Sequence, residues 1–228
     1  MTKNQSEGAI SSLVGTIKYD YIHNGTSWQP MYGRKIKDSL QTYSGHFIWP
    51  LDPKPSEIYI TDIAHGLSHE NRYANQSPYP YSVAWHSYVL SMVVPKHLQR
   101  FALVHDAPEA YIKDIPRIIR NVEPIKTSYG NMDNHLLNVI CEKLSVENEM
   151  EELLYYDVKM SHCEMLVWSR MNPIYLAKLK WLGVSSKDDF ALDWIQWVEK
   201  VPMKDHSMES KKIWLSRFQE LFPNYSDY

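Results

Sequence analysis

The segment FALVHDAPEAYIKDIPRIIR, residues 101–120, places an imidazole and three carboxylates directly after an apolar run. His105 and Asp106 are adjacent, Glu109 follows three residues after the aspartate, and Asp114 follows eight residues after it. Charged groups that face a hydrophobic core are costly unless something compensates their charge. Adjacent His and Asp side chains offer one nitrogen and one oxygen ligand, so a divalent cation is the simplest compensator.

Two residues elsewhere in the chain are also polar groups among apolar neighbours. His86 lies in SVAWHSYVL and Asp157 lies in EELLYYDVKMSHCEML. On a helix, His105 and Glu109 at i, i+4 would project to the same side. We therefore predict one divalent cation, whether Mn, Co, Zn or Mg, held by two nitrogens and two oxygens from three helices: His86, His105, Asp106 and Asp157.

The elements that position these residues are predicted to be helices. Thr61 is a candidate N-cap for the first one, and Ser82 is predicted to cap the helix that carries His86. Pro95 is predicted to begin a helix that continues through residues 96–111. Other helices are expected at residues 129–144, 150–170, 187–200 and 209–221.

The N-terminal part of the chain has a different pattern. Residues 1–57 hold five of the eight glycines, alternating stretches such as GTIKYDYI, and three prolines near their end. This pattern is typical of short strands or a hairpin. We predict an all-α protein with a small irregular or β-hairpin extension over residues 1–57, a helical core over 58–172, and further helices packed on that core over 173–228.

Composition excludes several classes of protein. Of the 228 residues, 44% are hydrophobic and 22% are charged, which is typical of a globular domain. The net charge of −3 gives no basic surface for nucleic acid, so no nucleic-acid partner is expected. Two cysteines are too few for a disulfide scaffold, and neither a leader peptide nor a membrane span is visible. These features predict a soluble, cytoplasmic protein.

The stretch from Gly45 to Leu166 resembles the HD-domain phosphohydrolases. The similar motifs are ITDIAHGLSHENRY, YSVAWHS, LVHDAPEAYIKDIPR and YDVKMSHCEML. They are most similar to the branch of bacterial deoxynucleoside 5′-monophosphate nucleotidases and their phage relatives, which include dATP triphosphohydrolases. The resemblance implies an HD-domain helical bundle over residues 58–172, a deoxynucleotide substrate and a homo-oligomer.

The resemblance also implies roles for single residues. It places the four metal ligands on His86, His105, Asp106 and Asp157, as the residues themselves suggest. Glu109 would act near the reacting water or the leaving group, and Asp114 would orient the attacking water. Arg72 would bind phosphate, and Tyr73 would lie against the sugar.

The segment after Asp114 departs from the family pattern. It reads DIPRIIR, with Arg120 where a lysine is usual. Arg120 keeps a positive charge that could meet a polyphosphate tail. Lys113 and Arg117 stand beside it, either as a solvated surface or as part of a site that attracts polyphosphate.

The expected function is therefore a metal-dependent phosphohydrolase of deoxynucleotides, with dATP or another dNTP as the leading substrate. The short interval between Asp106 and Asp157 favours the compact phage enzymes, which would place the protein in a host cytoplasm. A deoxynucleoside 5′-monophosphatase is the alternative. Hydrolysis of a cyclic or signalling nucleotide and a non-catalytic nucleotide-binding module are weaker alternatives.

Three other residues or pairs remain open to more than one interpretation. His65 and His69 have the i, i+4 spacing of a zinc pair, but no third ligand accompanies them at a recognised spacing. Glu164 shares a helix face with Asp157, where it could support a metal ligand or form a structural salt bridge. Cys163 is interpreted as a buried, inert thiol rather than a nucleophile.

Overall fold

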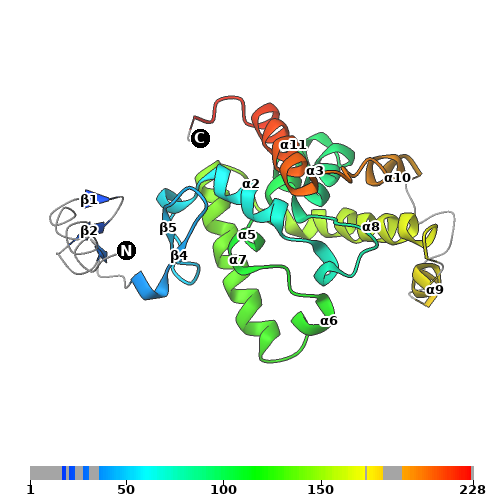
Figure 1. The fold of residues 1–228 in the computed structure, drawn as a ribbon, viewed down its shortest axis with the longest axis horizontal. Helices are drawn as coiled ribbons and strands as arrows, with labels where there is room; N and C mark the ends of the chain where they lie inside the picture. The colour runs from blue at the N-terminus through cyan, green and yellow to red at the C-terminus, as the bar shows by residue number, and fades with distance from the viewer. Residues whose placement is uncertain are drawn as a thin grey trace, which may run out of the picture.

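The computed structural model describes residues 17–18, 21–23, 28–30, 36–172, 174–181 and 192–226. Within these residues the fold is mostly helical, with short strands near the N-terminus (Figure 1). The predicted all-α class with a small extension is thereby confirmed. The first residues of the helix predicted at 187–200 lie outside the described residues. The boundaries of the three predicted units stay a prediction.

The helices follow one another with short connections. Their bounds are α2 Ile60–His69, α3 Val83–Val93, α4 Gln99–Val104, α5 Glu109–Ile112, α6 Arg117–Arg120, α7 Ile125–Leu144, α8 Met150–Ser169, α9 Ile174–Trp181, α10 Leu192–Val198 and α11 His206–Leu221. Short 3-10 helices are η1 Ile36–Asp38, η2 Pro55–Glu57, η3 Arg72–Asn75 and η4 Lys96–Leu98. Among these, α6 and α9 have no counterpart in the sequence prediction.

The strands form two small antiparallel sheets. Strands β1 Ile17–Lys18, β2 Tyr21–His23 and β3 Trp28–Pro30 pair in the order of the chain. Strand β4 Leu40–Gln41 pairs with β5 Phe47–Ile48. The strands predicted for the N-terminal extension are present, and β4 and β5 lie at the opposite side of the molecule from α9 and α10 (Figure 1).

Two apolar clusters hold the helices together. One contains buried residues of α3, α8 and α10, and the other contains buried residues of α2, α7 and α11. Helices α3, α4 and α7 contribute to both clusters, so they connect the two halves of the core. Helix α11 packs against α2, α3 and α4.

Gly66 sets the distance between α2 and α5. A Cβ atom at this position would lie only 2.7 Å from the Cβ and the carbonyl oxygen of Ala110. The two helices can approach this closely because glycine lacks a side chain. Glu109 begins α5, so this contact also determines where its carboxyl group lies.

Two of the predicted helix boundaries are wrong and one is confirmed. Ser82 caps α3, because its side chain accepts the backbone N–H of Trp85. Thr61 is not a cap, because α2 already begins at Ile60. The continuous helix expected over 96–111 is broken by a turn after Val104, since Pro108 lacks an N–H and its ring would clash with the carbonyl four residues earlier.

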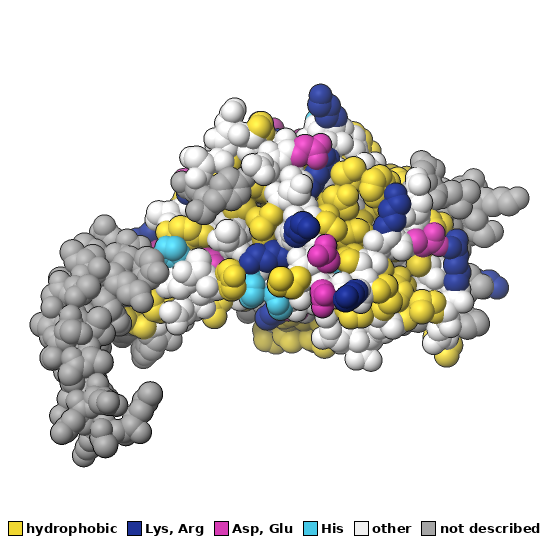
Figure 2. Space-filling view, turned by 45° about the horizontal axis from the view of Figure 1, so that its top comes forward, with side chains coloured by type: hydrophobic (Ala, Val, Ile, Leu, Met, Phe, Trp, Pro, Cys, Tyr) yellow, Lys and Arg dark blue, Asp and Glu magenta, His cyan; other side chains and the backbone are white. Residues whose placement is uncertain are grey.

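The surface shown in Figure 2 mixes positive, negative and hydrophobic side chains without a continuous basic stripe. Among the described residues, none of the helices combines the length and the apolar character needed to cross a bilayer.

A buried histidine joins α11 to the start of α3. Ser82 N–H donates to His206 Nε2 at 2.9 Å, and His206 Nδ1 donates to the Pro202 carbonyl at 2.9 Å. This pairing requires a neutral imidazole. Burial lowers the pKa of His206, and the hydrogen bond to Pro202 opposes that effect only in part.

We expect the free energy of unfolding to fall as the pH drops below about 6.5, the usual pKa of an unfolded histidine. In that range His206 binds a proton in the unfolded chain but stays neutral in the folded protein, so a lower pH favours unfolding. Urea unfolding at several pH values would show a smaller pH slope for His206→Gln than for the wild type. Equal slopes would mean that His206 does not contribute.

Candidate metal centre and pocket

His86 and Asp157 face each other between α3 and α8. His86 is fully buried, and its Nε2 atom lies 3.1 Å from Asp157 Oδ1. On the other side of the ring, Nδ1 lies 2.7 Å from Glu164 Oε1. An ionised carboxylate only accepts hydrogen bonds, so Nδ1 carries a proton and donates it. Burial and Arg72 oppose protonation of the second nitrogen, but Glu164 and Asp157 outweigh them and raise the pKa of His86 to about 9.

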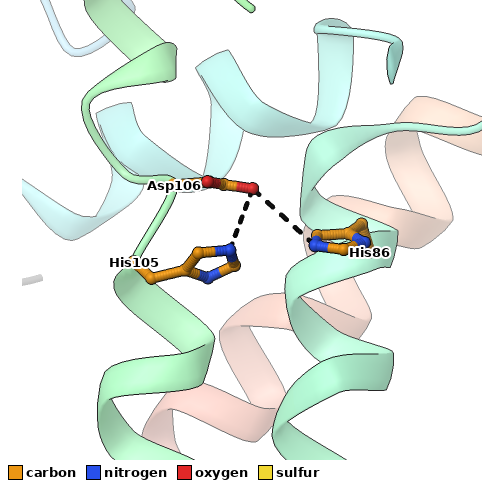
Figure 3. Close-up of side chains that lie close together, drawn as sticks. All are labelled: His86, His105 and Asp106. Atoms are coloured by element: carbon orange, nitrogen blue, oxygen red, sulfur yellow. Dashed lines mark ion pairs between the residues drawn. The ribbon is translucent and has the colours of Figure 1, made fainter. Parts of the chain in front are cut away.

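His105 and Asp106 lie in the turn between α4 and α5. His105 Nδ1 donates to the Ala102 carbonyl at 2.9 Å, and its Nε2 atom lies 3.1 Å from Asp106 Oδ2. His86, His105 and Asp106 each offer one possible ligand atom, and these three atoms lie within 4.8 Å of one another. Figure 3 shows the three side chains. This buried cluster could hold a metal ion.

Unsatisfied atoms within the cluster and on the neighbouring Asp157 would suit a cation. Among the described residues, His86 Nε2, His105 Nε2 and Asp157 Oδ1 are buried without an aligned hydrogen-bond partner. Such atoms are rare in folded proteins, because each loses its hydration without replacement. Two imidazole nitrogens and carboxylate oxygens are ligands that zinc, manganese and cobalt accept. Asp157 Oδ1 lies 3.1 Å from His86 Nε2 but does not belong to the group of three ligand atoms, so its role as a fourth ligand stays a prediction.

Arg72 is the positive charge beside this cluster. Its Nη1 atom lies 3.4 Å from Asp106 Oδ2, its Nη2 atom donates to Ser161 Oγ at 3.2 Å, and its Nε atom lies 3.5 Å from Glu164 Oε2. Burial opposes the charge on Arg72, but Glu164 and the other acids outweigh it and raise the pKa of the guanidinium. Arg72 therefore remains charged at the edge of the candidate metal cluster.

The backbone that carries Arg72 is unusual. Tyr73, Ala74 and Asn75 have φ values of 60°, 50° and 61°, so three consecutive non-glycine residues adopt the left-handed conformation. Each such residue costs about 1 kcal/mol or more, and such strain persists only where surrounding contacts enforce it. The Tyr73 hydroxyl donates to Glu164 Oε2 at 2.5 Å, and its ring packs edge-on against Trp168.

Glu109 and Asp114 are acids with raised pKa values. Burial raises the pKa of Glu109, and the negative charges of Asp106 and Asp114 raise it further. Burial also raises the pKa of Asp114, although Arg72 counteracts it. One oxygen of Glu109 is buried without a hydrogen-bond partner among the described residues. Perturbed acids of this kind gather at sites that transfer protons.

The structure places Lys113 away from the other predicted residues. Its side chain is 62% exposed and pairs with Glu70, Nζ to Oε2, at 2.7 Å. Its backbone has φ 74° and ψ 152°, a conformation normally confined to glycine. Glu70 also accepts the N–H of Asp114 at 3.3 Å, and the Tyr129 hydroxyl donates to the Lys113 carbonyl at 2.5 Å. Lys113 thus contributes to the site through its backbone conformation, which sets the position of the next residue, Asp114, at the pocket wall.

A pocket of about 420 Å³ opens beside the candidate metal cluster. Of the sequence-predicted site residues, His86, His105 and Lys113 do not line it. The remaining predicted residues form its polar walls. Its apolar walls are formed by Ile115, Pro116, Ile118, Val158 and Met165. The predicted residues that line the pocket are Arg72, Tyr73, Asp106, Glu109, Asp114, Arg117, Arg120 and Asp157.

Two polar residues of α8 complete the site. Ser161 lines the pocket and contacts Arg72, and its position four residues after Asp157 on the same helix was the available signal. Glu164 is fully buried; it contacts His86 and also forms an ion pair with Arg72, so the contacts required by both interpretations are present. By contrast, His69 Nδ1 contacts the His65 carbonyl, and neither ring belongs to a metal cluster within the described residues.

Comparison with known proteins gives two partial matches. A stretch of 118 residues is 36% identical to the uncharacterized protein YfdR of Escherichia coli and covers 51% of this chain. A stretch of 96 residues is 35% identical to an uncharacterized protein of Rhodobacter capsulatus and covers 38% of this chain. The chain spans 64% and 46% of the lengths of these two relatives. No protein-family model matches the chain.

Proposed function

We propose that the protein is a metal-dependent phosphohydrolase of 2′-deoxynucleotides, with dATP or another dNTP as its leading substrate. The observation that carries the hydrolase assignment is the convergence of unsatisfied ligand atoms from His86, His105 and Asp157 beside a pocket that also holds acids and arginines. The choice of deoxynucleotide is supported by the motifs that resemble the nucleotidase branch of the HD-domain enzymes.

His86, His105, Asp106 and Asp157 would hold the cation. When bound, a divalent cation supplies Lewis-acid chemistry: it makes a water more acidic and offsets charge on phosphoryl oxygens. Asp114, at the pocket wall, would accept a proton from the attacking water. Glu109, whose pKa is raised by burial and by the charges of Asp106 and Asp114, would donate a proton to the leaving oxygen.

The arginines of the pocket support a substrate with several phosphates. Arg72 lies next to the metal ligands, whereas Arg117 and Arg120 line the pocket from α6. A guanidinium binds a pair of phosphate oxygens in a fixed geometry, and two further arginines could bind phosphates beyond the reacting one. This distribution favours a triphosphate over a monophosphate.

The test is a phosphate-release panel with dNTPs, dNMPs and the matching ribonucleotides, each with Mn²⁺, Co²⁺, Mg²⁺ or Zn²⁺. We expect release of triphosphate from dNTPs, which a coupled pyrophosphatase or direct chromatography distinguishes from release of single phosphates. Treatment with a chelator should abolish turnover, and re-addition of the metal should restore it.

Each outcome of the panel bears on a different part of the proposal. Turnover of monophosphates alone would replace the triphosphatase with a 5′-nucleotidase. Equal turnover of ribonucleotides would remove the deoxynucleotide assignment. Absence of turnover from a protein that binds metal would contradict the enzymatic assignment and favour a nucleotide-binding module.

A further inference from the structure

Glu164 contacts both halves of the site. One carboxylate oxygen accepts the Nδ1 proton of His86, a metal ligand in the proposed function. The other accepts the Tyr73 hydroxyl and lies 3.5 Å from Arg72 Nε. Its side chain is completely buried, so water does not compete for these contacts.

The contact with His86 fixes which nitrogen can bind metal. Because Glu164 accepts the proton on Nδ1, Nε2 is the nitrogen that a metal would bind, and the metal would displace the proton that the neighbouring acids favour there. Carboxylate partners of this kind orient a ligating histidine and make it more basic, and their removal typically weakens metal binding about 10–100-fold. Burial alone would raise the pKa of Glu164, but Arg72 and His86 outweigh it and keep the carboxylate ionised.

The contact with Tyr73 constrains the strained segment. Left-handed residues at 73–75 need contacts that enforce them, and the base of the segment is tied by Arg72 N–H donating to the Tyr81 carbonyl at 2.9 Å. Within the segment itself, the short Tyr73 hydrogen bond and the Arg72 ion pair both end on Glu164. The same carboxylate therefore helps to hold the guanidinium beside the pocket, together with Asp106 and Ser161.

We propose that Glu164 is a positioning residue with two simultaneous functions: it fixes His86 as an Nε2 metal ligand and it holds the Arg72–Asn75 segment against the pocket. The first function rests on the proposed metal-dependent activity. The second depends only on the protein itself and is testable without metal.

Three variants separate the two functions. Glu164→Gln keeps the size of the side chain but removes its charge, and we expect a 10–100-fold weaker affinity for Mn²⁺ alone, followed by electron paramagnetic resonance. We also expect faster hydrogen–deuterium exchange at residues 71–76 in the metal-free protein. Tyr73→Phe should accelerate exchange of this segment while leaving Mn²⁺ affinity within about twofold. Glu152→Gln, an exposed acid on the same helix, should change neither quantity.

The proposal is overturned if Glu164→Gln leaves either Mn²⁺ affinity or segment exchange unchanged. If that variant does not fold, Glu164→Asp keeps the charge on a shorter side chain that cannot span His86 and Tyr73 together. Retention of both properties by Glu164→Asp would then overturn the proposal. If the wild type binds no Mn²⁺, the metal-dependent function and the first function of Glu164 fail together, whereas the exchange measurement still tests the second.

Discussion

His105→Ala is expected to abolish phosphate release and to weaken metal binding by on the order of 10²–10³-fold. The Nε2 atom of His105 is buried, has no hydrogen-bond partner among the described residues, and lies in the cluster with His86 and Asp106. Removing it leaves an incomplete ligand set. Isothermal titration with Mn²⁺ and the phosphate-release assay measure the two effects.

Asp106→Asn is the companion variant, because it removes the charge without leaving a cavity. His97→Ala is the matched control, since His97 is an exposed histidine that pairs with Glu152. Circular dichroism would establish that all three proteins are folded. If His105→Ala binds Mn²⁺ as tightly as the wild type, the metal site is elsewhere or absent.

Arg72→Ala is expected to destabilise the metal-free protein by about 3–5 kcal/mol, the usual effect of removing one partner from a buried ion network. Without the guanidinium, the carboxylates of Asp106, Asp157 and Glu164 face one another with less compensation. A divalent cation should restore part of this stability, because it supplies positive charge to the same oxygens. Urea unfolding with and without Mn²⁺ measures both quantities.

The same variant should lose about 10²–10³-fold in phosphate release, because a preorganised charge beside the reacting group is removed. Arg72→Lys should recover part of the stability but little of the activity, since an ammonium lacks the forked geometry. Arg170→Ala is the control, an exposed arginine at the end of α8 that pairs with Glu199. Unchanged stability and turnover in Arg72→Ala would contradict both the network and its catalytic role.

Much of the helical fold could be predicted from local signals. Ser82 is a strong cap and begins α3 as expected, and α8 follows from its long uninterrupted pattern. The turn after Val104 was missed because a proline at the first positions of a new helix and a proline that breaks an old one look alike in a sequence. Helix α9 was missed because Pro173 indicated an end and not a new beginning.

The candidate site could be predicted where a residue stood out from its surroundings. His86 and Asp157 are polar groups among apolar neighbours, and the structure brings them within 3.1 Å of each other. The contribution of Lys113 could not be predicted, because it depends on a backbone conformation stabilised by the distant residues Glu70 and Tyr129. For Glu164, helical spacing predicted that it shares a face of α8 with Asp157. It could not predict the contact with His86, which depends on how α3 packs against α8.

The turn between α4 and α5 bears on how a bound cation would relate to folding. The two candidate ligands of this turn, His105 and Asp106, are neighbours in the chain, so their mutual arrangement is available as soon as that turn forms. The candidate ligands on α3 and α8 would join them only when those helices pack against the turn. A tightly held ion would therefore report completed tertiary assembly, and a partly assembled chain would release it.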